Sequence, residues 1–383
     1  MSMREVAVIG VGQSKFGKFP ERSFLDLGHE AVLAALRDSG VSPKAVQAAY
    51  ASRLYVDIIT GEALLSGVGI AGIEIMNVEN ACAGGSTAVR ALWKDVATGF
   101  CDLGVAVGVE SMTTSPVVGK MIPPAPDDIE AHLGMAVPVA FALIARRLME
   151  TEGATPEDFA RVSVKAHRAG ALNPMAQYQK EVTVEEVLRS RMIADPITLL
   201  QCCPATDGAA AVVMCSLEVA RRYTSRPVKV LASALLSGSY AFAQPDFTSF
   251  EVGRRTARQA YELAGLGPED LDVVECHDAF APEELVHYED LGLCEAGGAV
   301  ALLRSGATEL GGRIPVNPSG GLQSLGHPLS ASGVRNVCEI ALHLRGQAGA
   351  RQTPGAKVGL AQMLGGAAAG LEAGACCIHI LGV

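Results

Sequence analysis

The chain has 383 residues, 49% of them hydrophobic, which is enough for two or three domains with large cores. Its net charge of −10 argues against nucleic acid as the main partner, because binding to phosphates needs a basic surface. No apolar run reaches the ~18 residues of a membrane span, and the N-terminus lacks a signal-peptide pattern. The ten cysteines lack zinc-ligand spacing and indicate a reduced, cytoplasmic compartment, with neither a metal site nor a disulfide framework.

The predicted elements alternate between strands and helices. Residues 6–11 form an apolar run typical of a buried strand, and residues 24–39 have helical periodicity. A further strand is expected at 101–107. Between about 115 and 200, proline clusters and charged helices indicate an insertion, after which the apolar run 207–216 returns to the core. Strand and helix signals then alternate to the end, which favours a layered α/β fold.

An internal repeat is the most informative feature of the organisation. Residues 35–55, ALRDSGVSPKAVQAAYASRLY, resemble residues 260–280, AYELAGLGPEDLDVVECHDAF; each contains a helix, a glycine stop, a proline and a strand. A second match aligns CAGGSTAVRAL, from Cys82, with HPLSASGVRNV, from His327. Two matches in the same order predict a duplicated fold. If the halves pack about a pseudo-twofold axis, Cys82 and His327 can face each other in one site.

Cys82 stands in NACAGGS, at the predicted start of a helix. The unpaired N–H groups and the dipole at a helix start favour a thiolate, and the glycines let a substrate approach the backbone. A buried small hydrophobe is the usual role of a free cysteine, and we assign that role to the other nine. The glycines and the repeat position favour a nucleophile at Cys82.

Three further candidate residues stand in other stretches. His327, in GHP, could deprotonate Cys82 and then stabilise negative charge, although an exposed loop histidine is the alternative. In ECHDAF a predicted strand ends at His277, where polar groups often point into a site, while Asp278 could cap the next helix. Gly365, in QMLGG, could donate a backbone N–H to an oxyanion or belong to a tight turn between core strands.

Together and in this order, these stretches resemble the thiolase superfamily over nearly the whole chain. VAVIGVGQSKFGKF is similar to its opening strand, NACAGGS to its nucleophile segment, GVESMT to the following strand end, and HLGM to the start of its loop domain. TDGAAAVV is similar to the return to the core, and HDAF, GHP and QMLGG stand where the remaining active-site blocks belong. HDAF in place of NEAF indicates the sterol-carrier-protein-like branch.

The resemblance implies a thiolase fold, in which duplicated βαβαβαββ halves form a five-layer αβαβα sandwich. With that organisation we expect an N-terminal half at 1–115 and 201–222, an inserted loop domain at 116–200, and a C-terminal half at 223–383. It also implies a homodimer and, for some members of the branch, a small OB-fold, zinc-containing partner subunit. Neither nucleic acid nor a membrane is expected as a partner.

The resemblance also implies roles for the candidate residues. Cys82 is implied as the acyl-accepting nucleophile, and His327 as its activator and a donor of the first oxyanion hole. His277 takes the place of the NEAF asparagine, which positions a water in that hole, while the amides of Cys82 and Gly365 would form the second hole. Further substrate contacts are expected at Ser237, Met363 and His132.

One departure from the family pattern concerns the acid/base. Typical thiolases carry a second cysteine in a CxG motif, where this chain has Met363; the branch can place it in HDCF, where this chain has Ala279. Cys276 stands beside His277 and is an alternative acid/base, although strand alternation would point it to the opposite side. We therefore expect a substituted acid/base, such as His277 or a substrate-ordered water.

The implied reaction is CoA-dependent Claisen cleavage, or condensation, of a 3-oxoacyl-CoA through a thioester on Cys82. Coenzyme A is then a substrate, and no permanently bound cofactor is expected. The alternatives are a thiolase-like retro-aldolase or an acyltransferase to a non-CoA acceptor and, third, a non-catalytic acyl-CoA or lipid-binding subunit. Basic residues of the insertion could meet the CoA phosphates, although such residues more often form a solvated helix face. They are Arg146, Arg147, Lys165 and Arg168.

Overall fold

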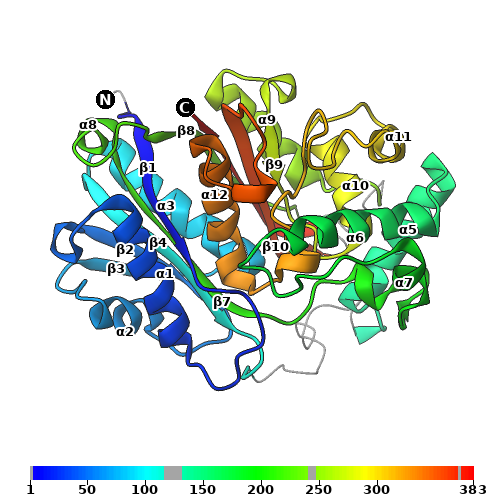
Figure 1. Ribbon diagram of the computed structural model, residues 1–383, viewed down its shortest axis with the longest axis horizontal. Coiled ribbons are helices and arrows are strands. Elements are labelled where there is room, and N and C mark those ends of the chain that lie inside the picture. Colours follow the sequence, from blue (N-terminus) through cyan, green and yellow to red (C-terminus); the bar gives the residue numbers. More distant parts are fainter. Residues whose placement is uncertain (1–2, 116–131, 240–246, 370–371) are drawn as a thin grey trace.

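The computed structural model describes residues 3–115, 132–239, 247–369 and 372–383 (Figure 1). Within them one mixed sheet runs in the order β3-β2-β4-β7-β1-β8-β11-β10-β9. The strands of its first part are β1 (Val6–Gln13), β2 (Ala48–Ser52), β3 (Glu74–Val78), β4 (Leu103–Ser111) and β7 (Asp207–Ser216). Those of its second part are β8 (Val228–Ser237), β9 (Val273–Glu275), β10 (Val358–Ala369) and β11 (Glu372–Gly382).

The two parts of the sheet repeat the same arrangement on either side of a junction. At the junction β1 and β8 are antiparallel and paired through Ala7 with Lys229 and Val8 with Val228. Outward from it, β7, β4 and β2 follow β1, while β11, β10 and β9 follow β8. In each part the inner pairs are antiparallel, and the next pair outward, β4 with β2 or β10 with β9, is parallel. The first part has one further parallel strand, β3, beyond β2. The predicted duplicated fold is confirmed.

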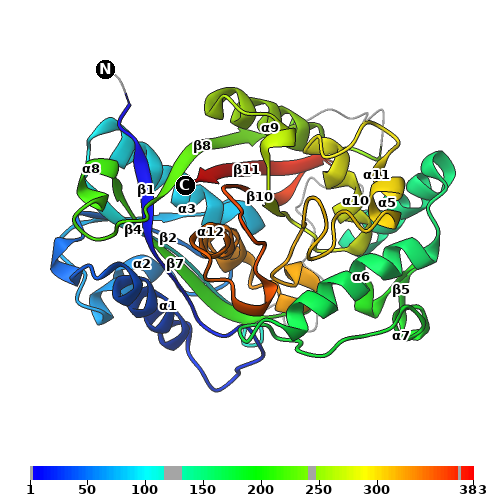
Figure 2. The same ribbon diagram turned by 45° about the horizontal axis from the view of Figure 1, so that its top comes forward.

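Helices lie outside and between the two parts of the sheet (Figure 2). On the outside, α1 (Phe24–Ser39) and α2 (Thr60–Gly67) pack on strands of the first part, and α9 (Glu251–Ala264) packs on β8 and β11. The central helices, α3 (Gly84–Thr98) and α12 (Leu329–Arg345), each contact strands of both parts. The layers therefore follow the predicted αβαβα order. The remaining helices of the two halves are α8 (Leu217–Ala220), α10 (Ala281–Asp290) and α11 (Ala299–Arg304).

The repeated local sequence forms the same local structure twice. α1 ends at Gly40 and α9 at Gly265, both in the left-handed conformation with φ of 68° and 66°. Glycine suits this position because it has no Cβ to clash with the preceding carbonyl. A 3₁₀ turn beginning at Pro43 or Pro268 then leads into β2 or β9. The equivalence predicted from the sequence extends to the caps.

The two central helices approach closely through glycines near their N-terminal ends. A Cβ added at Gly85 would overlap the carbonyl oxygen of Ser330, and one added at Gly333 would collide with the backbone of Ser86. Gly108, predicted to follow a strand, lies inside β4, where a side chain would also meet Ser330. This contact brings together the segments that lead into α3 and α12.

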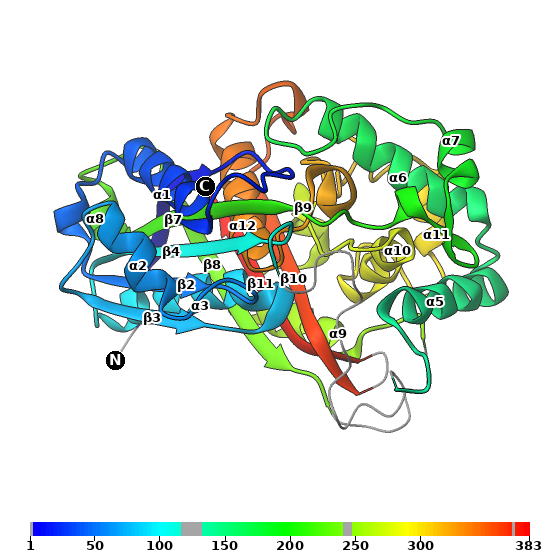
Figure 3. The same cartoon turned by 90° about the horizontal axis from the view of Figure 1, so that it is seen from below.

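The insertion forms helices and a small hairpin at one end of the molecule, beside α10 and α11 (Figure 3). It contains α5 (Val137–Glu152), α6 (Pro156–Ala171), α7 (Val184–Arg189), β5 (Met192–Ala194) and β6 (Ile197–Thr198). The ring of Phe141 stacks on Phe280 with 4.4 Å between centroids. Across the described part of the chain, every helix is too short or too polar to span a bilayer.

Candidate active site

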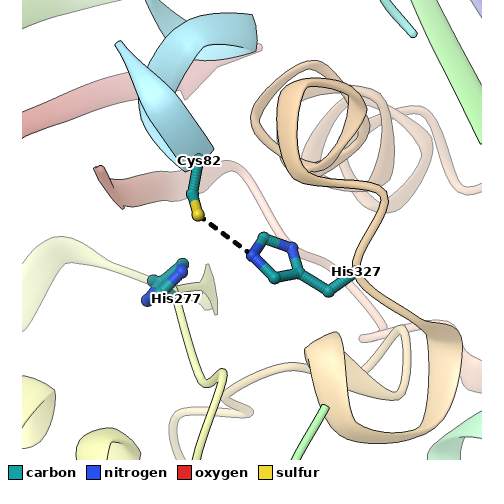
Figure 4. A group of neighbouring side chains, drawn as sticks. All are labelled: Cys82, His277 and His327. Atoms are coloured by element: carbon teal, nitrogen blue, oxygen red, sulfur yellow. Dashed lines mark hydrogen bonds between the residues drawn. The ribbon is translucent and has the colours of Figure 1, made fainter. Parts of the chain in front are cut away.

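Cys82 lies in a 3₁₀ turn, Ala81–Ala83, that leads directly into α3 (Figure 4). Ala81 has a φ of 48°, a left-handed conformation that costs a residue with a Cβ about 1 kcal/mol. The turn is held by the N–H of Ala83, which donates to the carbonyl of Asn80 at 3.0 Å, and by the Asn80 amide, which donates to Thr87 Oγ1 at 2.9 Å. The strained turn presents the half-buried thiol at the start of the helix.

His327 meets Cys82 from the segment that leads into α12. Its Nε2 lies 3.3 Å from Cys82 Sγ, and its Nδ1 lies 2.8 Å from Ser332 Oγ. The His327 backbone N–H donates to Thr206 Oγ1 at 3.0 Å, so both the backbone and the ring are held. With a proton on Nδ1 shared with Ser332, Nε2 is free to accept the thiol proton. The predicted meeting of the two halves at Cys82 and His327 is what the geometry shows.

His277 completes the cluster from the segment after β9. Its backbone N–H donates to Gln362 Oε1 at 2.8 Å, and its ring stands edge-on to His327 with 5.3 Å between centroids. Cys82 Sγ and one ring nitrogen of each histidine all lie within 4.8 Å of one another. Among the described residues, His277 Nε2 is buried without a hydrogen-bond partner, which leaves a polar atom for a substrate.

The two histidines are in opposite charge states. Burial, together with the positive charge of His277, holds the pKa of His327 well below its usual range, so this ring is neutral. Burial alone would also lower the pKa of His277, but the carboxylate of Glu283, whose Oε1 lies 2.6 Å from Nδ1, and to a lesser degree the neighbouring Cys82 outweigh it and raise the pKa to about 10. Glu283 is ionised despite its burial, because His277 and His287 lower its pKa to about 2. A neutral base and a cationic acid therefore flank one thiol.

Gly365 lies against the Cys82 turn. A Cβ at this position would overlap the carbonyl oxygen of Asn80 and stand 2.6 Å from the backbone nitrogen of Ala83, so the site accepts only glycine. The alternative of a tight turn is wrong, because β10 continues past Gly365, which pairs with Ala375 of β11. Its role as an oxyanion donor stays a prediction.

The other predicted substrate contacts differ in their exposure. Met363 is fully buried in the apolar core and pairs with Cys377 of β11. Ser237 is exposed at the end of β8, and His132 is exposed ahead of α5. Their roles in substrate binding stay predictions.

Two alternatives that the sequence left open are settled by the structure. Asp278 does not cap the next helix; its Oδ1 accepts the backbone N–H of Leu322 at 2.6 Å, while α10 has Phe280 at its N-cap without a side-chain cap. Cys276 is fully buried, and its Sγ faces the Asn317 amide at 3.5 Å, as strand alternation predicted.

One of the four basic residues considered for phosphate binding is not accessible. Lys165 is buried in an ion pair with Glu284. The three arginines are largely exposed and pair with surface carboxylates, so they stay free to exchange those partners for phosphates. They are Arg146, Arg147 and Arg168.

Sequence reasoning missed Glu283 and Cys203. Glu283 follows His277 by six residues in HDAFAPEEL, and only the bend between β9 and α10 returns its carboxylate to the imidazole. Cys203 stands in CCPATDG, and its backbone N–H donates to the carbonyl of Ala279 at 2.8 Å, beside the site. An acid just inside a helix after a polar strand end is the signal that could have found Glu283.

The same atoms could be considered for a metal ion, since a thiol and imidazoles are common ligands. A protonated His277, however, carries a proton on each ring nitrogen and offers no lone pair. A metal ion at this place would therefore have to displace the proton that Glu283 holds on His277.

Comparison with known proteins identifies the family. Residues 6–218 match the model of the thiolase N-terminal domain, and residues 233–374 match the thiolase C-terminal domain-like model. The chain is 41% identical over 385 residues to an acetyl-CoA acetyltransferase of Methanothermobacter thermautotrophicus, with 99% of both chains covered. It is 39% identical to the benzoylsuccinyl-CoA thiolase subunit BbsB of Thauera aromatica, with 95% of each covered.

Two further comparisons refine this result. The chain is 38% identical to sterol carrier protein 2 of Bos taurus, covering 94% of this chain and 70% of that protein. A solved structure described as the Ltp2-ChsH2(DUF35) aldolase superposes with a TM-score of 0.85 at 28% identity, over 99% and 98% of the two chains. The fold and the matches define an acyltransferase enzyme of the thiolase superfamily. Within it, the chain belongs to the sterol-carrier-protein-like branch.

Proposed function

We propose that the protein is a thiolase that cleaves or forms 3-oxoacyl-CoA through an acyl thioester on Cys82. The observation that carries the proposal is the 3.3 Å contact between Cys82 Sγ and His327 Nε2, with the unpartnered His277 Nε2 beside it. In cleavage, His327 takes the thiol proton and the thiolate attacks the 3-oxo carbon. The Cα–Cβ bond breaks, an acyl-CoA enolate leaves, and CoA later takes the acyl group from Cys82.

The enolate must be protonated. Typical thiolases use a second cysteine for this step, but this chain has Met363 and Ala279 at the two positions where that cysteine would stand. We assign the step to His277, whose pKa of about 10 keeps it a cation at neutral pH. A cation also stabilises the negative charge of the enolate before the proton moves. Backbone amides at Cys82 and Gly365 would stabilise the oxyanion of the acyl-transfer step.

The test is to mix the protein with CoA and a panel of linear, aromatic and dicarboxylic 3-oxoacyl-CoA thioesters. A shortened acyl-CoA, and a mass increase of the protein on Cys82 matching the acyl group, are expected. Neither product with any member of the panel would refute the proposal. Adduct formation without bond cleavage would indicate transfer to a different acceptor, and binding without an adduct would indicate a non-catalytic acyl-CoA-binding subunit.

Retro-aldol cleavage is the second candidate, because the solved structure with a TM-score of 0.85 is described as an aldolase. An aldolase acting on a 3-hydroxyacyl-CoA does not need an acyl-accepting thiol. Replacing Cys82 with alanine separates the two reactions: cleavage that survives the change is aldol chemistry, and cleavage that depends on the thiol is thiolase chemistry.

We also propose that the protein is a homodimer whose subunits meet at β3. This strand ends one side of the sheet, and Met76 on it is 44% exposed. Edge strands leave backbone groups free to pair with a second copy. The name of the similar aldolase includes a DUF35 component, which supports a partner subunit here. Light scattering of the purified chain, alone and with such a subunit, tests both points.

The extents of the two family models support a boundary between the halves near residue 222. The two family models meet between 218 and 233, and that gap contains the start of β8. We propose halves at 1–115 with 201–222 and at 223–383, with 116–200 inserted.

A further inference from the structure

We propose that Glu283 is a positioning residue that holds His277 as a cationic proton donor, in place of the second cysteine of other thiolases; this rests on the proposed thiolase function. Glu283 lies in the first turn of α10, behind His277 as seen from Cys82. Its carboxylate touches no reacting atom, so it would act entirely through the histidine.

The contacts of Glu283 fix the orientation of the His277 ring. Glu283 Oε1 lies 2.6 Å from His277 Nδ1 and 3.6 Å from His287 Nε2, and all three side chains are buried. The short contact fixes Nδ1 on the carboxylate side of the ring and turns Nε2 toward Cys82. Within the described residues Nε2 has no partner, and a buried donor without a partner is unfavourable. A substrate oxygen or carbanion in front of it would supply that partner.

The surrounding charges favour this assignment. Burial alone would leave His277 neutral, as it leaves His327, and the Glu283 carboxylate is the largest influence in the opposite direction. The positive charge so created also helps to keep His327 neutral. The Glu283 carboxylate is therefore the main charge that separates the two histidines into an acid and a base, with Cys82 adding to the effect at His277. The titratable and charged groups around this pair are Cys82, Cys203, Asp278, Glu283, His287, His327 and Arg335.

The proton transfers balance over the cycle. The Nε2–H bond of His277 breaks, its proton bonds to the α-carbon of the leaving enolate, and the electron pair stays on Nε2. His327 meanwhile holds the proton taken from Cys82. Its ring stands 5.3 Å from that of His277, and the proton passes between them directly or through a water. The thiol of the incoming CoA then returns a proton to the site when the acyl group leaves Cys82.

The test compares the wild type with Glu283→Gln, which keeps the shape but removes the charge, and Glu283→Asp, which keeps the charge. Three quantities are measured with acetoacetyl-CoA and acetyl-CoA: acylation of Cys82, deuterium exchange into the acetyl-CoA methyl group, and kcat against pH. Glu289→Gln is the matched control, because it makes the same change on a half-buried carboxylate of α10 that binds a loop N–H.

For Glu283→Gln we expect acylation of Cys82 by acetyl-CoA and KM within about threefold of the wild type, because this acylation releases CoA, forms no enolate and uses the thiol and His327. Deuterium exchange and kcat at pH 8 should fall about 100-fold, the range of a lost acid catalyst. The alkaline limb of the kcat profile, near pH 10 in the wild type, should move to lower pH, so that activity recovers on acidification. Glu283→Asp should restore most of the exchange, and Glu289→Gln should keep the wild-type profile.

Some outcomes would overturn the inference. An unchanged kcat profile in Glu283→Gln, or a kcat lowered by the same factor at every pH, would show that Glu283 does not set the charge of His277 and has only a structural role. Loss of exchange in Cys203→Ala with retention in Glu283→Gln would make the neighbouring thiol the donor instead.

A readout without substrate separates this inference from the proposed function. In protein labelled with ¹⁵N-histidine, the His277 signals are assigned by comparison with His277→Asn. We expect an imidazolium at pH 8 in the wild type and a neutral ring in Glu283→Gln. If the wild type is inactive toward every 3-oxoacyl-CoA but Glu283→Gln still neutralises His277, the proposed function is wrong while the effect of Glu283 on His277 stands. If the wild type is active but its His277 is neutral, only the inference is wrong.

Discussion

The segments that lead into α3 and α12 occupy equivalent places in the two halves, yet they differ in exposure and in backbone strain. The first has Ala81 in a left-handed conformation and presents a half-buried thiol. The second buries His327 and holds it through Thr206 and Ser332. The difference shows that duplication supplied a meeting point between two helix starts. A strained segment on one side then provides the nucleophile, and a firmly held segment on the other provides the base.

Replacing the thiol should have the largest effect. Cys82→Ala is expected to lower acyl transfer at least about 10⁴-fold, since removal of a nucleophile abolishes the covalent path. Turnover of acetoacetyl-CoA with CoA, and the mass of the protein after incubation, measure it. Cys101→Ala, a buried thiol just before β4, is the control and should acylate normally. If Cys82→Ala cleaves a 3-hydroxyacyl-CoA, the protein is an aldolase and the thiolase proposal is wrong.

Removing the base from the segment before α12 should have the next largest effect. His327→Asn is expected to slow acylation of Cys82 about 10³-fold, because the thiol loses the neutral base that contacts it. Rapid-quench measurement of the acyl-enzyme tests this. Ser332→Ala should show a smaller loss, because it frees the ring orientation but keeps the base. Equal acylation rates in His327→Asn and the wild type would exclude His327 as the base.

A side chain added at Gly365, against the turn that contains Cys82, should have an intermediate effect on kcat. Gly365→Ala places a Cβ against Asn80 and is expected to cost about 1–3 kcal/mol of stability and to lower kcat about 100-fold through a displaced oxyanion donor. Urea denaturation and steady-state kinetics measure the two parts. Gly265→Ala, which has a positive φ but open space around the new Cβ, should lose about 1 kcal/mol and keep its kcat. A wild-type kcat in Gly365→Ala would remove this glycine from the site.

Replacing Glu110, which contacts Ser330 at the start of α12, should have the smallest effect, a change in how stability depends on pH. Buried Glu110 accepts N–H bonds from Leu54 and Tyr55 at 3.0 Å and an O–H bond from Ser330 at 3.2 Å, and burial raises its pKa to about 7. A carboxyl whose folded pKa exceeds its ordinary 4.5 adds stability that is full below pH 4.5 and lost as the pH rises through 7.

We therefore expect the free energy of unfolding of the wild type to fall between pH 5 and 8 by roughly 1–3 kcal/mol relative to Glu110→Gln. Denaturation by urea at both pH values measures this. Glu251→Gln, which alters an exposed carboxylate paired with Arg255, should follow the wild type. Parallel curves for the wild type and Glu110→Gln would show that Glu110 is ionised throughout.

Much of the candidate site could be predicted because its residues stand in local patterns. The glycines after Cys82, the repeat that aligns it with His327 and the strand end at His277 are each visible in a short stretch. Asp278 was harder, because the sequence places it beside His277, while packing turns its carboxylate to the backbone N–H of Leu322. Which way a side chain faces at a strand end depends on the neighbouring elements.

The sequence by itself determined the repeated elements, their caps and the candidate nucleophile, because helix stops, apolar runs and glycine positions act over a few residues. Only the tertiary structure decided the charges within the site. The pKa values of His277 and His327 depend on burial and on the Glu283 carboxylate, and no short-range pattern encodes the distance at which a charge acts. The same thiol and histidines in another packing would lack this division between acid and base.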